Sequence, residues 1–353
     1  MSHTYLITLK PLEPFFFGGE FTFGADETRK ESSRYSATST QFPQQTALLG
    51  MLRKTMLIQN GNLTMHRKGE WVDSSGRGKF SQNHEDAKNL AGTGAFSYEN
   101  SVDLGSIVFL SPIFIKDGKS CFTANAKDYG LELKAQENAL VSFGSGRKQA
   151  LVFQDYDAKK HECFEFISQN KKLKNFEDFF KEIETVGIKK SKDSESDEDG
   201  FFRKKSYFPQ KSAHFAFFAT FSEPLKWNSS VIVSLGADQS SFALTLKEEL
   251  EGFELLFKEV HEVKELSRMV LVSETVISQE AYEACSFIWG KRTSFRQLTN
   301  ARHGKKSKRY YLLERGSVLY TEDLQRLDKA LNQEHLRTVG INHYFKIEGK
   351  KHV

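Results

Sequence analysis

Short apolar segments with the composition of β-strands recur along this 353-residue chain, and they constrain its fold more than any other feature. They are rich in Val, Ile, Phe and Thr and are bounded by turn-forming residues, as expected of strands. They occupy residues 5–9, 106–115, 214–221, 231–236, 241–246, 268–276 and 341–347. Helical segments do not alternate regularly with them, which argues against a parallel, doubly wound sheet. The sequence therefore predicts an α+β fold with antiparallel sheets.

Helical periodicity is clear in one segment and weaker in three others. Residues 44–59 repeat apolar side chains such as Leu48 and Leu52 at helical spacing, directly after Pro43 and shortly before Gly61. Proline suits a helix start and glycine a helix end, so this segment predicts an amphipathic helix. Shorter helices are expected over residues 85–90, 175–186 and 321–331.

Composition limits the class of protein. Hydrophobic residues make up 39% of the chain, which is enough for a packed core, and the length favours two domains. Cys121, Cys163 and Cys285 form no paired motif, which argues against a zinc site and a disulfide framework. The first residues enter a strand-like pattern without a signal peptide, and no apolar run approaches the ~20 residues needed to cross a bilayer. We therefore expect a soluble cytoplasmic protein with no membrane partner.

Residues 291–309 form the strongest local charge feature of the chain. Eight of them are Lys or Arg, although the net charge of the whole chain is only +4. No acidic residue interrupts the stretch, Phe295 lies within it, and Tyr310 and Tyr311 follow it. Cations bind phosphates, and aromatic rings stack on unpaired bases. The stretch therefore predicts a contact with single-stranded nucleic acid, and a solvated basic loop without a ligand is the alternative.

Motifs of known enzymes are scarce. The ten histidines show no metal-binding spacing, and neither a GxxxxGK[ST] phosphate loop nor a GxSxG nucleophile motif occurs. We therefore expect no metal, no cofactor and no catalytic residue. Residues 144–146 (GSG) precede Arg147 and Lys148, so this turn either joins two strands of a hairpin or holds a phosphate. His303, within the basic stretch, is the candidate acid or base for an alternative activity, metal-free RNA cleavage.

Several motifs together resemble one protein family. YLITLKPLEPFFFGGEFTFG and FPQQTALLGMLRKTML, within residues 5–57, are similar to the start of subunit three of the Cmr complex. This complex is the type III-B CRISPR effector, and the subunit belongs to the RAMP superfamily. GIKKSKDSESDEDGFFRKKSYF at residues 187–208, VIVSLGADQSSFALTL at 231–246 and VGINHYFKI at 339–347 agree with the resemblance.

The resemblance implies two ferredoxin-like, RRM-related RAMP domains with antiparallel sheets and long loop insertions. On this basis we expect an N-terminal domain of residues 1–210, with an insertion over about 60–100 and a thumb-like hairpin over about 187–203. The C-terminal domain would comprise residues 211–353 and carry the basic loop 291–309.

The resemblance also implies a non-catalytic RNA-binding subunit of a ribonucleoprotein in antiviral defence. It would grip the 5′ tag of the CRISPR RNA and bridge the large cyclase-like subunit to the backbone RAMP subunits, so that target RNA is an indirect partner. The glycine-rich loop of RAMP proteins is reduced here to little beyond Gly340, and residues 44–59 lack the histidine of the RNA-processing relatives. The missing histidine argues against one alternative, a metal-independent RAMP endoribonuclease. A purely structural subunit that contacts only protein is the other alternative.

Charge, aromatic rings and the resemblance together select the candidate RNA-binding residues. They are Gln44, Gln45, Arg53, Arg147, Lys148, Lys189, Lys190, Phe202, Arg203, Lys204, Lys205, Tyr207, Arg292, Arg296, Arg302, His303, Lys305, Lys306 and Arg309. Those near the first helix would read base edges or phosphates, aided by the positive end of the helix dipole. An ordinary helix start and a strand with one solvated face are the alternatives for these segments. The FFFGG turn is expected to be a buried aromatic corner rather than an RNA contact.

Overall fold

In a computed structural model, the chain folds into two compact units. The structure describes residues 2–19, 21–23, 35–63, 65–67, 70–72, 85–143, 146–153, 163–190, 196–210, 212–227, 229–249, 253, 256, 258–295, 298–300, 305–306 and 308–350. Unit 1 consists of Met1–Ser120 and Phe176–Phe253, and unit 2 consists of Cys121–Asn175 and Glu254–Val353. Each unit is therefore assembled from two segments that are distant in sequence.

This division differs from the predicted boundary between residues 210 and 211. β15 (His214–Phe221) follows that boundary, yet it pairs antiparallel with β1 (His3–Pro11) at the start of the chain. A cut at residue 210 would separate two hydrogen-bonded neighbours of one sheet. The pairing of β15 with β1 therefore places residues 214–221 in the same unit as the start of the chain.

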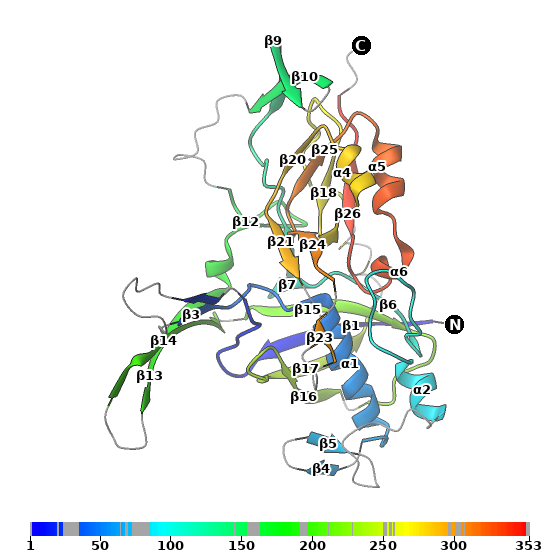
Figure 1. The fold of residues 1–353 in the computed structure, drawn as a ribbon. Coiled ribbons are helices and arrows are strands. Elements are labelled where there is room, and N and C mark those ends of the chain that lie inside the picture. Colours follow the sequence, from blue (N-terminus) through cyan, green and yellow to red (C-terminus); the bar gives the residue numbers. More distant parts are fainter. Residues whose placement is uncertain are drawn as a thin grey trace. The chain divides into compact units, whose positions relative to one another are not determined.

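The part of the main sheet that belongs to unit 1 is antiparallel and has the strand order β7-β15-β1-β17-β16. The remaining strands are β7 (Phe114–Asp117), β16 (Ser230–Leu235) and β17 (Ser240–Glu248), and β6 (Ile107–Leu110) also pairs with β15. The helix α1 (Gln45–Gln59) follows β1 in sequence. The order β7-β15-β1-β17 is that of a ferredoxin-like sheet. β16 lies between β15 and β17 in sequence, where the second helix would be expected, and it forms an edge strand next to β17 (Figure 1).

The helix α1 starts and ends close to where the sequence predicts. Leu48, Leu52 and Met56 are fully buried, as the apolar stripe of an amphipathic helix requires. Gly61 follows the helix with a φ of 75°, a left-handed conformation that glycine adopts without strain. The observed helix thus confirms the strongest prediction made from periodicity.

The predicted insertion over residues 60–100 contains one helix and one hairpin in its described part. The helix α2 (Glu85–Ala91) agrees with the predicted helix, and β4 (Met65–Arg67) pairs with β5 (Glu70–Val72). Ala87 of α2 packs in a cluster with Leu57 of α1. Burial of this alanine anchors the insertion to the first helix.

A second sheet of unit 1 contains the predicted thumb-like hairpin. β13 (Phe180–Lys190) and β14 (Ser196–Pro209) are antiparallel, β3 (Tyr35–Thr38) pairs with β14 in parallel, and β2 (Phe21–Phe23) pairs with β3. The predicted helix over residues 175–186 is wrong, because only η1 (Phe176–Asp178) is helical and the following residues form β13.

The short turn at η1 explains this error. Phe176, Phe179 and Phe180 are all buried, and their spacing is also that of a helix face. One 3-10 turn suffices to bring the three rings into the core, where Phe180 stacks on Phe215 with ring centroids 4.6 Å apart. Beyond Phe180 the backbone pairs with β14, so the chain continues as a strand.

Unit 2 contains a second ferredoxin-like arrangement. Its central antiparallel sheet has the order β20-β25-β18-β26. Along the chain the elements are β18 (Arg268–Leu271), α4 (Gln279–Glu283), β20 (Phe287–Trp289), β25 (Val318–Tyr320), α5 (Leu324–Leu331), α6 (Glu334–Arg337) and β26 (Tyr344–Ile347). Two β-α-β units follow one another along the chain, as in the ferredoxin-like fold, and α4 contacts α5 (Figure 1).

Both faces of this sheet are buried within unit 2. On one face, Met269 and Leu319 pack with α4 and α5 in a single apolar cluster. On the other face, Val270 and Val318 pack with Ala126 and Leu133 of the segment 121–175. Alternate residues of each strand thus enter different cores, as a strand buried on both sides requires.

The segment 121–175 adds further strands to unit 2. β11 (Phe166–Ser168) lies between β8 (Ser120–Ala124) and β12 (Leu173–Lys174), and β9 (Leu133–Phe143) pairs with β10 (Gly146–Phe153). The pairing of β9 with β10 confirms the hairpin interpretation of the GSG turn.

Among the described residues, no helix has the length and apolar character required to span a bilayer.

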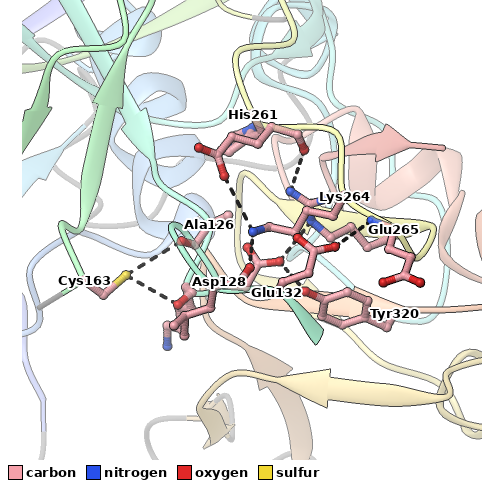
Figure 2. A network of polar contacts seen from close by, with 12 residues as sticks. Ala126, Asp128, Glu132, Cys163, His261, Lys264, Glu265 and Tyr320 are labelled. Atoms are coloured by element: carbon pink, nitrogen blue, oxygen red, sulfur yellow. Dashed lines mark hydrogen bonds and ion pairs between the residues drawn. The ribbon is translucent and has the colours of Figure 1, made fainter. Parts of the chain in front are cut away.

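A buried polar network also ties this segment to the sheet (Figure 2). The Asp128 carboxylate lies 3.0 Å from Arg268 Nε and accepts a 2.5 Å hydrogen bond from the Tyr320 hydroxyl. Lys264 donates to the carbonyl oxygen of Leu131. Burial, together with the Asp128 charge, raises the pKa of Tyr320, so its hydroxyl keeps the proton it donates.

Candidate nucleic-acid interface

The first candidate site is the β13–β14 hairpin, which we call ribbon A. Its residue pairs run from Phe180 opposite Pro209 to Lys190 opposite Ser196. Only residues 202–205 of β14 pair with β3 as well, so the end near Lys190 has two strands (Figure 1). The backbone of Lys189 and Lys190 belongs to this two-stranded end, and their side chains lie outside the described part of the structure.

Two predicted cations of ribbon A are paired with carboxylates from the opposite strand. Arg203 Nε lies 3.2 Å from Glu184 Oε1, and Lys205 Nζ lies 2.9 Å from Glu182 Oε1. The hydrogen bond to Glu182 raises the pKa of Lys205, which therefore stays charged. Both pairs are exposed to solvent, so each contributes little to folding stability.

Lys204, between these two cations, points to the other face of the strand. Its ammonium group forms an ion pair with the Asp238 carboxylate in the turn between β16 and β17. The same ammonium lies 5.2 Å from the centre of the Phe16 ring, within the range of a cation–π contact. All three predicted cations of β14 are therefore engaged within the chain.

The predicted aromatic residues of ribbon A serve its own packing. The Phe202 ring lies over Gly187, because a Cβ added at that glycine would be 2.3 Å from ring atoms of Phe202. Tyr207 is buried, and its backbone exchanges hydrogen bonds of 3.1 and 2.8 Å with Phe15. Neither ring is presented as a free platform for a base.

The FFFGG turn is the buried aromatic corner that the sequence predicts. Phe15 and Phe16 are buried. The Phe15 ring centroid lies 5.4 Å from that of Phe180 and 5.9 Å from that of Phe242. Gly19 is required here, because a Cβ would fall 1.8 Å from the carbonyl oxygen of Thr38. The turn therefore organises the core beneath β14.

The residues predicted near α1 have structural roles. Gln45 is buried; its Nε2 donates to the carbonyl oxygen of Ser111 over 3.0 Å, and its Oε1 accepts from the amide of Ile113 over 3.3 Å. Gln44 precedes the helix without capping it through its side chain. The geometry therefore removes Gln45 from the candidates for contact with RNA.

Arg53 clasps the loop that follows α2. Its two terminal nitrogens donate to the carbonyl oxygens of Gly94 and Asp103 over 3.1 and 2.7 Å. Burial lowers the pKa of Arg53, and the nearby Asp103 charge opposes this effect. The guanidinium thus connects two turns of a loop, and both of its terminal nitrogens are engaged within the chain.

The second candidate site is formed by β21 (Arg292–Phe295) and β24 (Tyr310–Leu313), which we call ribbon B. Ser294 lies opposite Tyr311 in an antiparallel register, and β19 (Thr275–Val276) pairs with the other edge of β24. The Arg292 guanidinium lies 4.6 Å from the centre of the Tyr311 ring. Both side chains are exposed, Tyr311 at 41%.

Further cations surround this pair. Arg309 is exposed, and Lys308 Nζ lies 5.5 Å from the centre of the Tyr310 ring. Lys291 is 3.7 Å from a carboxylate oxygen of Glu314. Among the described residues, no ion pair with a carboxylate involves Arg292 or Arg309. Ribbon B therefore presents positive charge beside an exposed aromatic ring.

The other predicted residues are only partly placed. Arg147 and Lys148 are in β10, and Lys305 and Lys306 form β23 opposite β22 (Leu298–Asn300), with no side chain described for these four. Arg296, Arg302 and His303 lie outside the described residues. Within the part of the chain that the structure describes, no three His, Cys, Asp or Glu side chains are grouped as metal ligands would be.

Sequence reasoning missed the acids of ribbon A. Reading residues 175–186 as a helix hid the fact that Glu182 and Glu184 share one face of a strand. The period-two alternation in FKEIETV was the signal that could have found them. Asp238 had no such signal, because its approach to Lys204 depends on how the two sheets of unit 1 pack.

Comparison with protein families gives a match over most of the sequence. The family described as CRISPR-associated protein (Cas_Cmr3) matches residues 7–347. None of the curated proteins matches the chain.

Solved structures with a similar fold share little sequence with this chain. A chain in the cryo-EM structure of the Type III-B Cmr-beta bound to cognate target RNA is 13% identical, with a TM-score of 0.50 and coverage of 97% of this chain and 96% of that chain. A second structure of the Type III-B Cmr-beta, bound to cognate target RNA and AMPPnP, gives 14% identity, the same coverages and a TM-score of 0.46. At such identities the first likeness shows the fold alone, and it agrees with the α+β architecture.

The family match includes the FFFGG corner, α1, ribbon A and ribbon B. It confirms the resemblance noted from the sequence motifs. Because the match extends over nearly the whole sequence, the chain belongs to the Cas_Cmr3 family of CRISPR-associated proteins.

Proposed function

We propose that this chain is a non-catalytic RNA-binding subunit of a type III-B CRISPR effector complex. It grips the 5′ tag of the CRISPR RNA and bridges the large cyclase-like subunit to the backbone subunits. Family membership supports the place in such a complex. The similar chain of known structure comes from a Type III-B assembly bound to target RNA.

Ribbon B is the observation that carries this proposal. The Arg292 guanidinium lies over the exposed Tyr311 ring, and Arg309 lies two residues before that tyrosine, directly before β24. Guanidinium groups bind phosphates in a bidentate manner, and a tyrosine ring offers a surface for one unpaired base. A ribbon with both features suits a single strand whose bases are splayed apart.

The fold of unit 2 explains why a ribbon, rather than a sheet face, takes this role. RRM-type proteins commonly stack RNA bases on the open face of their sheet. Here both faces of the β20-β25-β18-β26 sheet are covered by apolar side chains, with Val270 and Met269 in different cores. RNA contact in unit 2 is therefore assigned to the hairpin that extends from β20 and β25.

Binding of tagged RNA at several salt concentrations tests the proposal. The full chain, with its partner subunits, should bind a CRISPR RNA that carries the repeat-derived 5′ tag more tightly than a scrambled RNA of equal length. In R292A/R309A, the slope of log K against log salt should flatten by about 1.4, because each lost phosphate contact removes about 0.7. An unchanged slope would contradict the role of ribbon B.

Two controls complete this test. Lys119→Ala removes an exposed cation of unit 1 that lies in neither ribbon, and it should leave the slope unchanged. The tagged RNA should be recovered intact after incubation without metal, because the proposed subunit is not a nuclease. Photo-crosslinking of the tag in the assembled particle should label ribbon B, and labelling confined to other subunits would sink the assignment.

A further inference from the structure

The cations and acids of ribbon A form a matched set. Arg203, Lys204 and Lys205 are consecutive, and each has its own carboxylate partner: Glu184 at 3.2 Å, Asp238, and Glu182 at 2.9 Å, respectively. The partners come from two places, β13 and the turn between β16 and β17. A strand that presents three adjacent cations to RNA would not be expected to neutralise every one of them.

The strand register explains how these ion pairs form on both faces of the strand. Glu184 lies directly opposite Lys205 but pairs with Arg203, two positions away, and Glu182 pairs diagonally with Lys205 in the same sense. These four side chains share one face, since directly opposed and alternate residues point the same way. Lys204 points to the other face, where Asp238 meets it.

These ion pairs are exposed, so their removal costs the fold little. The paired side chains retain between 32% and 56% of their solvent exposure. Exposed pairs are weak and are readily displaced by another anion, such as a phosphate. Their main effect is on the local potential, because three carboxylates cancel the field that would attract any polyanion.

We infer that Glu182, Glu184 and Asp238 are specificity-determining residues that mask the cations of ribbon A from arbitrary RNA. This inference rests on the proposed function, because the RNA that displaces the acids is the strand already held by ribbon B and the partner subunits. A tethered strand has a high effective concentration at ribbon A and displaces the acids. Free RNA has no such advantage and gains little by binding there.

The test compares the wild-type full chain with E182Q/E184Q/D238N on two RNA probes. One probe is a fluorescent 20-nucleotide polyuridine, and the other carries the repeat-derived 5′ tag. The triple variant should bind polyuridine about 10-fold more tightly at low salt. Its slope of log K against log salt should steepen by about 2, since three phosphates at about 0.7 each are newly engaged. The affinity for the tagged RNA should increase less than the affinity for polyuridine, so the discrimination between the two probes falls.

Two further variants keep the result interpretable. E223Q removes an exposed acid of unit 1 outside the ion pairs, and its affinity for polyuridine should equal that of the wild type. D238N alone changes only a turn residue, and it should give about one third of the change in slope. Equal affinity of wild type and triple variant for polyuridine, or an equal gain on both probes, would overturn the inference.

The outcomes also separate this inference from the proposed function. If the wild type binds the tagged RNA through Arg292 and Arg309 and the triple variant gains nothing, the masking fails and the function stands. If the triple variant gains affinity for polyuridine, while the wild type binds tagged and scrambled RNA equally well, the masking stands and tag recognition fails.

Discussion

At the scale of single residues, Gln45 illustrates a polar side chain that stabilises the interior rather than a ligand. Its amide joins the carbonyl of Ser111 and the amide of Ile113, two groups just before β7. Gln45→Ala removes both hydrogen bonds from a buried site, which should lower the free energy of unfolding by about 2 kcal/mol.

Urea denaturation of the full chain measures this loss. Gln44→Ala is the matched control, since that neighbouring side chain makes no capping hydrogen bond and the substitution should change stability little. An equal effect of the two substitutions would show that the buried amide has no special role.

His343 makes stability depend on pH. Burial lowers the pKa of His343 to about 4, and its Nε2 lies 2.9 Å from the carbonyl oxygen of Arg337, to which the neutral ring donates. The unfolded histidine binds its proton near pH 6.5, so the stabilisation is present above that pH and is lost as pH falls toward 4. The loss should approach about 3 kcal/mol at 1.36 kcal/mol for each pKa unit.

Denaturation midpoints between pH 7 and pH 4.5, compared with those of His343→Gln, measure this term. The glutamine retains a donor for Arg337 but does not titrate, so the variant should lose less stability than the wild type as pH falls. Parallel pH profiles would contradict the assignment.

At the scale of elements, ribbon A depends on one glycine. The Phe202 ring occupies the space that a Cβ at Gly187 would need, with ring atoms 2.3 Å from the ideal position. Gly187→Ala should therefore displace the ring and destabilise the hairpin by about 1–3 kcal/mol, the usual cost of overpacking. Hydrogen exchange should accelerate in β13 and β14, while the main sheet of unit 1 keeps its protection.

Gly50 supplies the opposite case. It lies within α1, and a Cβ there meets nothing within 4 Å. Gly50→Ala should therefore stabilise the chain by about 0.5–1 kcal/mol through helix propensity alone. Destabilisation by both alanines would mean that loss of glycine flexibility, rather than the Phe202 contact, governs Gly187.

Elements whose signals are local could be predicted from the sequence. The apolar stripe of α1 and the alternation in β16 and β17 lie within single segments, so they were identified without knowledge of their partners. β13 could not, because Phe176, Phe179 and Phe180 at and before its start satisfy helical spacing, and its partner strand lies farther along the chain.

The same distinction between local signals and contacts with distant segments applies to the candidate site. Composition located the cations of both ribbons, because charge is a property of the segment itself. It could not show which cations already have acidic partners, since Glu184 and Arg203 meet only through the register of two strands. The stacking of Arg292 on Tyr311 likewise depends on a pairing across the hairpin.

At the scale of the whole molecule, unit 2 depends on a segment inserted between two parts of unit 1. Residues 254–353 alone lack Ala126 and Leu133, which cover one face of the sheet, and Arg268 loses the Asp128 carboxylate that pairs with it in the interior. An unpaired buried charge is costly, typically about 3–5 kcal/mol. This fragment should therefore lack cooperative unfolding and a near-UV circular dichroism spectrum.

Addition of the segment 121–175 in trans should restore both properties. The same segment with Asp128→Asn should restore them less, because it supplies the apolar cover without the negative charge. A cooperative transition in the isolated 254–353 fragment would show that the sheet tolerates an open face.

The interleaving of the two units also sets an order for folding during synthesis. The ribosome releases residues 121–175 long before it makes β26, the last strand that packs against Leu133. Meanwhile unit 1 can close its main sheet as soon as β17 emerges. The nascent chain therefore exposes the apolar side chains of this segment until β26 is made, and chaperones are expected to bind it while translation continues.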